Sequence, residues 1–375
     1  MPEPIYLDHN ATTPVLPEVL DAMVPYLRGK FGNPSSAHVY GRRARIAVEQ
    51  ARDQVAGLLG CDAEEIVFTS GGTEANNLAI HGIAARSVRR QVVTSAIEHP
   101  SVAQPIGWLA ANGWDVRQIS VDESGSARIA EVEAGVSTAT ALVSIAHSNG
   151  ETGVLQPIAE IVRQARRVDA YVHTDAAQSV GKVPVDVRAL DVDLLTVVGH
   201  KLYAPQGVGA LYVRRGLELA PLLLGAGHER GLRAGTENVP AIVGLGAASA
   251  AALRDLHVES ARVQELRERL WLRLAGDVPE LALNGHPTDR LPNTLNVRFP
   301  RVSGAALLAE TPEVAASTGS ACHEGEKKKG EEFGLVRLTL GRSTTAEDVD
   351  RAAAALARSW RTLVPARRRQ VPRVQ

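Results

Sequence analysis

A histidine and a lysine stand side by side between two apolar stretches of the sequence. Residues 194–198 and 208–213 are rich in Val and Leu and predict buried strands, and the loop between them presents His200 and Lys201. An ammonium group taken out of water costs several kcal/mol unless it is paired or neutralised. Such a lysine indicates a lowered pKa or a Schiff base with a carbonyl compound. The alternative is a strand-end lysine whose amine reaches water, and this segment alone leaves both open.

Polar side chains also follow the other predicted strands directly. Strands are expected at residues 66–69, 92–95, 141–146 and 171–175, with helices between them. The carboxyl ends of parallel strands meet at one edge of a sheet, and ligands of open α/β sheets bind there, so we expect these groups in one crevice. The polar residues concerned are Thr73, His99, Asp175, Gln178 and Lys201.

A glycine-rich turn leads from the first of these strands into a helix. Residues 70–77 read Ser-Gly-Gly-Thr-Glu-Ala-Asn-Asn. Glycines let the backbone approach a ligand closely, and the free N–H groups at the start of a helix favour an anion. The turn, with Gly72 and Thr73, is therefore a candidate phosphate cradle, although many strand-to-helix turns look the same with nothing bound.

Together these groups match the needs of one cofactor. Pyridoxal phosphate requires a lysine for a Schiff base, an acid beside its pyridinium nitrogen and a cradle for its phosphate. Lys201, Asp175 and the turn at residues 70–77 supply these groups along a chain of alternating strands and helices. We therefore expect a pyridoxal phosphate site, and no metal centre.

The elements that must position these groups divide into two sets. Alternating strands and helices predict a large α/β domain over residues 14–257. Residues 1–13 and 258–375 are expected to form a smaller α+β domain, because the rhythm of the pattern changes there. The remaining predicted elements are helices at 17–27, 41–59, 239–253 and 258–274, helices that begin at 304 and 345, and strands at 293–299 and 335–340.

Composition excludes several classes of protein. The 375 residues carry a net charge of -1 and are 45% hydrophobic, which is typical of a globular protein and argues against nucleic acid as the main partner. The N-terminus lacks the features of a signal peptide, and the apolar stretch at 239–253 is too short to span a membrane. Two cysteines, Cys61 and Cys322, make no disulfide framework, so we expect a cytoplasmic protein with reduced thiols.

Longer motifs occur in a fixed order along nearly the whole chain. They are Ser70-Gly-Gly-Thr-Glu74, Glu98-His99, Asp175-Ala-Ala-Gln178, Gly199-His-Lys-x-Tyr-x-Pro205, Gly227-His-Glu-Arg-Gly-x-Arg-x-Gly-Thr236 and Thr318-Gly-Ser-Ala-Cys322. In these motifs the sequence resembles the cysteine desulfurases and the related selenocysteine lyases, in the class V aminotransferase branch of the fold-type-I pyridoxal phosphate enzymes. The resemblance implies a large domain with a mostly parallel sheet flanked by helices, and a smaller α+β domain.

The resemblance also implies a role toward the cofactor for each matching residue. Lys201 would hold pyridoxal phosphate as a Schiff base, Asp175 would pair with the pyridinium nitrogen, and Gln178 would hydrogen-bond the phenolic oxygen. His99 would stack on the ring and move protons. The phosphate ligands would be Gly72, Thr73 and His200, joined by Thr236, which would reach the phosphate of the neighbouring subunit in a homodimer.

Three further residues are expected to handle the substrate. Arg337 matches the family's arginine for the substrate carboxylate, which a bidentate guanidinium suits, and Asn33 would assist it. Cys322 lies on a small, polar loop, and its thiolate would take the sulfur of L-cysteine as a persulfide and leave L-alanine. Without the resemblance, an inert loop cysteine is the alternative.

Three features depart from the family's pattern. The second Asn of the family's Asn-Asn-Glu-x-Gly motif falls on Gly150, and Val198 stands where many desulfurases have a phosphate-binding Ser. Selenocysteine lyases resemble this chain in having an apolar residue there. The segment between Cys322 and Arg337 is shorter than in enzymes with a mobile thiol loop, which bears on how far the thiol travels.

These observations give one leading hypothesis and two alternatives. The first is a homodimeric, pyridoxal phosphate-dependent cysteine desulfurase that passes sulfur to an acceptor protein. The second is a selenocysteine lyase on the same scaffold, acting on L-selenocysteine. The third is a cofactor-poor relative that serves as a binding partner in sulfur transfer, and it draws on Gly150, Val198 and the short loop.

Overall fold

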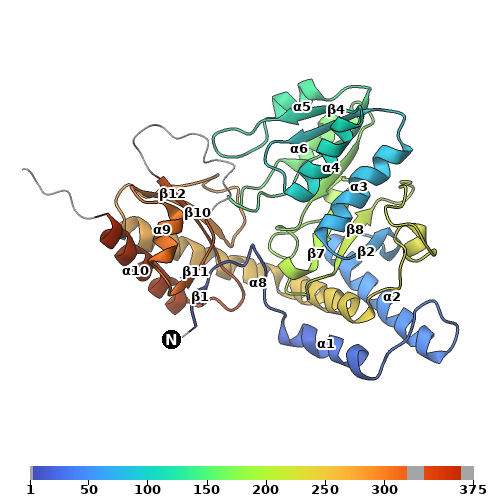
Figure 1. Cartoon of the computed structure of the whole chain (residues 1–375), viewed down its shortest axis with the longest axis horizontal. Helices are drawn as coiled ribbons and strands as arrows, with labels where there is room; N and C mark the ends of the chain where they lie inside the picture. Colours follow the sequence, from blue (N-terminus) through green and yellow to red (C-terminus); the bar gives the residue numbers. More distant parts are fainter. Residues whose placement is uncertain (1–2, 319–332, 365–375) are drawn as a thin grey trace, which may run out of the picture. The chain divides into compact units, whose positions relative to one another are not determined.

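The computed structural model describes residues 3–318 and 333–364 and divides into two compact units (Figure 1). The large unit comprises residues 10–260 and 286–291, and the small unit comprises residues 1–9, 261–285 and 292–375. Residues 10–13, 258–260 and 286–291, which were expected in the small domain, belong to the large unit. Thr13 N donates to the His200 carbonyl oxygen at 2.9 Å, and Leu291 N donates to the Gly153 carbonyl oxygen at 2.8 Å, so the first and last of these segments are bonded to the large unit.

The large unit is built on a seven-stranded sheet in the order β2-β8-β7-β6-β5-β3-β4. Strand β8 runs antiparallel to both of its neighbours, and the other neighbouring pairs are parallel. The carboxyl ends of the parallel strands therefore share one edge. The strands are β2 (Ile66–Thr69), β3 (Gln91–Ser95), β4 (Asp115–Ile119), β5 (Thr140–Ser144), β6 (Tyr171–Asp175), β7 (Leu194–Val198) and β8 (Gly209–Val213).

Helices cover both faces of this sheet, as Figure 1 shows. Alternate residues of a strand point to opposite faces, so Leu194 packs with α3 and α4 while Leu195 packs with α2, α6 and the first part of α8. The helices are α1 (Pro17–Arg28), α2 (Val39–Leu59), α3 (Gly72–Arg86), α4 (Pro100–Ala111), α5 (Ile129–Gly135), α6 (Ile158–Arg166), α7 (Val187–Leu190) and α8 (Val239–Asp277), with the short 3-10 helices η1 (Ala63–Glu65), η2 (Gly199–Lys201) and η3 (Glu229–Gly231).

The small unit contains a three-stranded antiparallel sheet in the order β12-β10-β9. A separate parallel pair joins β1 to β11, with Ile5 opposite Val314. Thr345 and Asp348 form a capping box at the start of α10, as the Thr-Ala-Glu-Asp sequence predicts. The remaining elements are β1 (Ile5–Tyr6), β9 (Ala282–Leu283), β10 (Thr294–Pro300), α9 (Gly304–Ala309), β11 (Val314–Ala315), β12 (Phe333–Thr339) and α10 (Ala346–Leu363).

Several helices and strands differ from those expected from the sequence, and the short elements α5, α7, β9 and β11 were not predicted. The helices expected at 239–253 and 258–274 are one helix, α8, because the polar residues between them contain no Gly or Pro to end it. Strand β4 was not predicted, because it lies at the edge of the sheet and four of its five residues are not buried. By length and composition α8 could cross a membrane, but 61% of its most apolar window is buried in the structure, as in the core helix of a folded domain.

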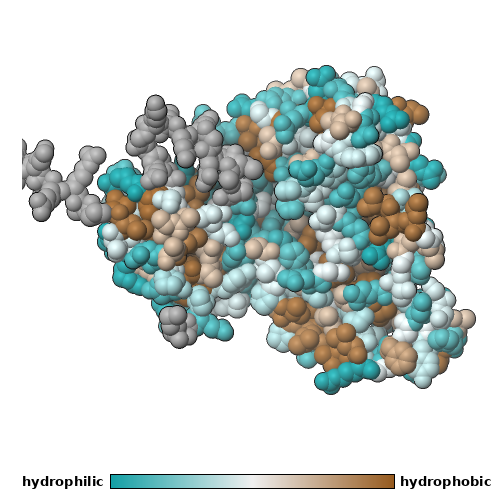
Figure 2. All heavy atoms as spheres, viewed as in Figure 1, coloured by the Kyte–Doolittle hydropathy of each residue, from teal (hydrophilic) through white to brown (hydrophobic). Residues whose placement is uncertain are grey.

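Apolar side chains also gather at the surface of the large unit. Figure 2 shows an apolar patch where Figure 1 places α1, and Leu20 and Leu27 of this helix are 50% and 62% exposed. Leu222, Leu223 and Leu224 form a second exposed set in the loop after β8. Exposed apolar patches of this kind are typical of interaction surfaces.

A buried ion pair fixes the loop before α8 to the core of the large unit. The guanidinium of Arg52, on α2, donates to both carboxylate oxygens of Glu229 at 2.8 and 2.7 Å. Glu229 also accepts a hydrogen bond from Phe68 N at 2.8 Å, and the Arg52 guanidinium lies over the Phe68 ring. The two charged side chains are 5% and 2% exposed, so neither has water as a substitute partner.

Replacing Arg52 by Met is expected to lower the free energy of unfolding by about 3–5 kcal/mol, because it leaves the buried Glu229 carboxylate without its cation. Denaturant unfolding followed by circular dichroism measures this change. Arg117→Met is the control, since Arg117 and its partner Asp115 are 60% and 48% exposed. Equal stability of the two variants would contradict the expectation.

Candidate functional site

Two of the expected site residues meet at one backbone oxygen. Lys201, the last residue of η2, donates from Nζ to the carbonyl oxygens of Asn10 and Ala11, the latter at 3.0 Å. Gln178 donates from Nε2 to the same Asn10 oxygen at 3.0 Å. The lysine amine and the glutamine amide, which are 23 positions apart in the sequence, are therefore brought together at the edge of the sheet.

Asp175 ends β6 as a buried carboxylate with neutral hydrogen-bond donors. Its Oδ2 accepts from Asn76 Nδ2 at 2.8 Å, and its Oδ1 accepts from Ala177 N at 2.9 Å. Among the described residues, no lysine, arginine or histidine forms an ion pair with it. A carboxylate in such surroundings suits a cationic group of a ligand.

His99 caps the start of α4 and points its Nδ1 at Ser101. Ser101 N donates to this nitrogen at 3.1 Å, and the Ser101 hydroxyl lies 2.7 Å from it. The hydroxyl in turn accepts from Asn76 Nδ2 at 2.8 Å, and Asn76 also holds Asp175. The structure therefore connects His99 to Asp175 through two buried side chains.

The glycine turn at the start of α3 leaves space for a ligand. Gly71 has φ +144°, a conformation that favours glycine, and a Cβ built on it would meet no atom within 4 Å. A Cβ on Gly72 would lie only 2.5 Å from a methyl group of Val198, so the turn packs directly on the end of β7. The free N–H groups of α3 thus lie close to the strand that leads to His200 and Lys201.

His200 lies half-buried beside the N-terminal segment of the large unit. Its Nδ1 is 3.1 Å from the Thr12 hydroxyl, and its carbonyl oxygen accepts from Thr13 N at 2.9 Å. Burial, followed by the charges of Lys201 and Lys182, lowers the pKa of His200. The lowered pKa favours the neutral ring, which can donate a hydrogen bond to a phosphate.

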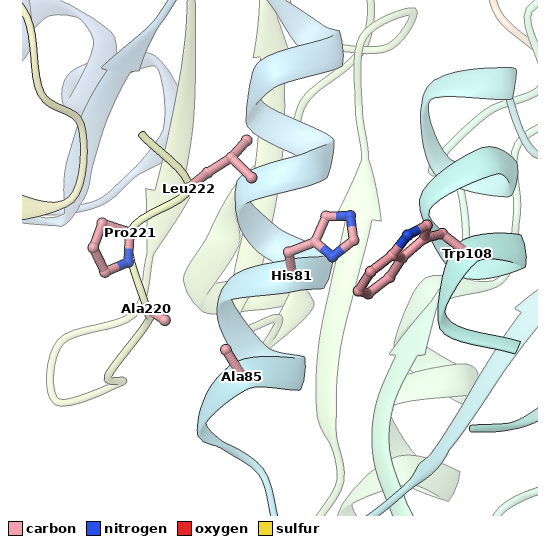
Figure 3. Close-up of a pocket in the computed structure, with 6 residues that line it drawn as sticks. All are labelled: His81, Ala85, Trp108, Ala220, Pro221 and Leu222. Carbon is pink, nitrogen blue, oxygen red and sulfur yellow. The ribbon is translucent and has the colours of Figure 1, made fainter. Parts of the chain in front are cut away.

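A surface pocket of about 490 Å³ opens beside Thr73 and His99, at the start of α3 and α4. Thr73 and His99 line it together with Ser101, and it continues between α3 and α4 to His81 and Trp108. Figure 3 shows His81 and Trp108 facing one another in a neighbouring pocket of about 390 Å³, whose other wall is the loop after β8. The two rings pack edge to face at 5.1 Å, and burial lowers the pKa of His81.

The other expected site residues belong to other segments of the chain. Asn33 is exposed in the loop between α1 and α2, where its side chain accepts from Ser35 N at 2.9 Å. Thr236 is exposed in the loop before α8. Arg337 belongs to the small unit, where it donates to Asp8 at 2.9 Å, and Cys322 lies outside the described residues.

The chain is similar in sequence to proteins of a known family. Residues 5–352 match the family model of the aminotransferase class-V proteins. The chain is 45% identical over 363 residues to a cysteine desulfurase of Trichormus azollae, which covers 92% of this chain and 90% of the relative. The chain belongs to the cysteine desulfurase family. Among solved structures it is similar to a NifS-like protein, with a TM-score of 0.90 and 35% identity, covering 95% of this chain and 98% of that one.

A second similar solved structure is a complex with an amino acid. This structure, SspA in complex with cysteine, is 36% identical to the chain, with a TM-score of 0.78 over 89% of this chain and 98% of that one. The family and the mostly parallel α/β fold expected from the sequence motifs are thus confirmed.

The two departures that the structure describes have physical consequences. Gly150 offers its carbonyl oxygen to Asn10 Nδ2 at 3.1 Å, and a Cβ built on it would lie 3.4 Å from Gln178 Nε2, which is ordinary contact. A larger side chain at this position would therefore pack beside Gln178. Val198 is buried under Gly72, where it supplies a methyl group and no hydrogen bond.

Several residues of the site were missed by the sequence analysis. Asn10 and Lys182 hold Gln178 from either side, with Lys182 Nζ 3.1 Å from Gln178 Oε1. Asn76 and Ser101 hold Asp175 and His99. Asn76 lies within the glycine-rich turn at residues 70–77, and Ser101 comes two residues after His99. The pattern around Asn10 and Lys182 gave no signal, since polar residues at a sheet edge are common.

Glu98, which directly precedes His99, is a further charged residue of the site that was not predicted. Its Oε1 accepts from the Ser95 hydroxyl at 2.5 Å and from Ala146 N at 3.0 Å, so it joins the ends of β3 and β5 directly before His99. Its Oε2 is buried and has no hydrogen-bond partner among the described residues. Burial, followed in the same direction by the Asp175 charge, raises the pKa of Glu98 to about 7.

Glu98→Gln is expected to remove a pH dependence from the stability of the protein. Between the ordinary value of 4.5 and the folded value of about 7, the folded state keeps a proton that the unfolded state releases. The wild type therefore loses about 3 kcal/mol of unfolding free energy, relative to the variant, as the pH rises through this window. Denaturant unfolding of both proteins from pH 4 to 8 measures the difference.

Two buried histidines also make the stability depend on pH, but they do so equally in the wild type and in Glu98→Gln. Burial lowers the pKa of His147 to about 4 and also lowers that of His173, so both add stability as the pH rises, and both are present in the two proteins. Their contribution cancels in the difference. A difference that stays constant across the window would show that Glu98 does not titrate there.

Proposed function

We propose that the chain is a pyridoxal phosphate-dependent cysteine desulfurase, which removes sulfur from L-cysteine and leaves L-alanine. The observation that carries the proposal is the meeting of Lys201 and Gln178 at the Asn10 oxygen, on the sheet edge where Asp175 ends β6. The near full-length similarity to cysteine desulfurases supports it. Curated relatives of the chain are named cysteine desulfurases, so the selenocysteine lyase and the cofactor-poor relative are not favoured.

The residues of the large unit fit pyridoxal phosphate. The open space at Gly71 and the start of α3 suit its phosphate, and the buried Asp175 carboxylate suits a protonated ring nitrogen. Lys201 would hold its aldehyde carbon. When bound, the cofactor supplies an electron sink for the bonds of the amino acid.

Further contacts to pyridoxal phosphate would come from the residues around the start of α3, Asp175 and Lys201. Gln178 would donate its amide to the phenolic oxygen, and His99 would cover the ring from α4. The phosphate would be bound by Gly72, Thr73 and His200, and by Thr236 of a second copy of the chain.

Arg337 would bind the carboxylate of cysteine. The guanidinium is 9% exposed and is held by Asp8, which also accepts from the Ser317 hydroxyl at 2.8 Å. This support leaves the planar group oriented, and an oriented guanidinium forms two parallel hydrogen bonds with a carboxylate. Asn33 would assist from the loop after α1.

Cys322 would take the sulfur. Its thiolate attacks the sulfur of the bound cysteine, an S–S bond forms while the carbon–sulfur bond breaks, and the remaining three-carbon amino acid takes up a proton and leaves as L-alanine. The persulfide would then pass to an acceptor protein. We further propose a homodimer in the cytoplasm, for which the exposed apolar side chains of α1 and of the loop after β8 supply contact surface.

Cys322→Ala is the sharpest test of this function. The variant should bind cofactor as the wild type does but release no sulfide from L-cysteine in the presence of a thiol. Mass spectrometry should find an added sulfur atom on Cys322 in the wild type and in Cys61→Ala. Cys61→Ala is the matched control, because burial, followed by the Glu65 charge, raises the pKa of the Cys61 thiol to about 12.

A second measurement separates loss of the thiol from loss of the cofactor. Borohydride treatment followed by peptide mapping should place a pyridoxyl group on Lys201 in the wild type and in both cysteine variants. Desulfurase turnover that survives in Cys322→Ala would refute the persulfide step. A wild-type protein without the pyridoxyl group would refute the function as a whole.

Arg337→Lys is expected to raise the KM for cysteine about tenfold or more with a smaller change in kcat, because lysine offers a single point charge in place of a fork. Steady-state kinetics of alanine release measures both constants. Arg298→Lys is the control, since Arg298 is an exposed residue of β10 in the same sheet. An unchanged KM in Arg337→Lys would remove Arg337 from the substrate site.

A further inference from the structure

A chain of hydrogen bonds links the two groups expected to contact the cofactor ring. It runs from Asp175 Oδ2 to Asn76 Nδ2, from Asn76 Nδ2 to the Ser101 hydroxyl, and from this hydroxyl to His99 Nδ1, with distances of 2.8, 2.8 and 2.7 Å. Asn76 is fully buried and Ser101 is 8% exposed. The chain crosses from β6 to α3 and α4, so it joins three separate elements.

The direction of each hydrogen bond follows from the chemistry of the groups. The Asn76 amide nitrogen can only donate, so the Asp175 carboxylate and the Ser101 oxygen both accept from it. Ser101 N also donates to His99 Nδ1, at 3.1 Å, and a backbone N–H has no other role to take. His99 Nδ1 must therefore present its lone pair, and the Ser101 hydroxyl donates to the same nitrogen.

We propose that Asn76 and Ser101 are positioning residues that hold His99 as the tautomer with its proton on Nε2 and couple its orientation to that of Asp175. Two donors aimed at Nδ1 leave no site there for a proton. The neutral ring then offers an N–H group, not a lone pair, at Nε2. This inference rests on the proposed function for its meaning, because His99 and Asp175 matter as the groups placed about the cofactor ring.

The coupling has a direct consequence for what His99 does. In the Nε2–H form the neutral ring donates a hydrogen bond to a partner in the pocket, and it takes up no proton at Nε2. A base role at Nε2 would first require the proton to move to Nδ1, which would break the hydrogen bonds from Ser101. His99 is therefore set as a donor while the chain of hydrogen bonds stands.

Nitrogen NMR of the full-length protein tests the proposal. The protein is labelled with ring-¹⁵N histidine, and His99 is assigned by the loss of its signals in His99→Gln. We expect Nδ1 to resonate as an unprotonated nitrogen and Nε2 as a protonated one. In Ser101→Ala the Nδ1 resonance should shift, because the hydroxyl donor is lost while the backbone N–H at this position remains. A protonated Nδ1 in the wild type would overturn the proposal.

The affinity for pyridoxal phosphate gives a second readout. Asn76→Ala removes the donor to Asp175, so the Kd for the cofactor should rise about tenfold, as for loss of one hydrogen bond to a charged group. Ser249→Ala is the control, because it removes a fully buried hydroxyl bonded to the Leu245 carbonyl oxygen at 2.8 Å, outside the chain of hydrogen bonds. An unchanged Kd together with an unchanged Nδ1 resonance in Asn76→Ala would also overturn the proposal.

The two readouts are independent of sulfur chemistry. The tautomer of His99 is measured without substrate, so a protein that showed the expected NMR signals but released no sulfide would contradict the proposed function and leave the positioning role standing. Thermal unfolding of each variant, compared with Ser249→Ala, separates a local change at His99 from general loss of the fold.

Discussion

The candidate site depends on one backbone carbonyl, that of Asn10. Its oxygen accepts from Lys201 and from Gln178, and the Asn10 side chain lies within 3.4 Å of Lys182. A carbonyl oxygen has two lone pairs, so it holds two donors at a fixed separation. The lysine amine is thereby held in place by neutral carbonyl oxygens, those of Asn10 and Ala11.

Much of this arrangement could be predicted from the sequence, because the sheet is regular. The strand that ends at Val198 is a short, mostly apolar run, and His200 and Lys201 come shortly after it. The strand at Tyr171–Asp175 is mixed in polarity but largely buried, and its last residue is the polar group of the candidate site. The alternation of strands and helices predicts parallel strands, and parallel strands bring these ends to one edge. The glycine turn before α3 was recognised by its composition, and its φ value of +144° at Gly71 confirms why glycine stands there.

The parts that could not be predicted are those that depend on exact side-chain contacts. Nothing in the pattern around Asn76 or Ser101 indicates that these residues meet, since one lies in α3 and the other in α4. The place of Arg337 beside Asp8 joins positions 329 apart, which only the paired strands of the small unit bring together. The continuous helix α8 was predicted as two because hydropathy changes along it while helix propensity does not.

The contact between Gly72 and Val198 makes substitutions at the two positions depend on each other. A methyl group of Val198 occupies the place that any side chain at position 72 would need, at 2.5 Å from a built Cβ. The residue that position 72 tolerates therefore depends on the residue at position 198. Serine at position 198 would have one γ atom where valine has two, which would ease the steric requirement for glycine opposite, so the pair is best exchanged as a unit.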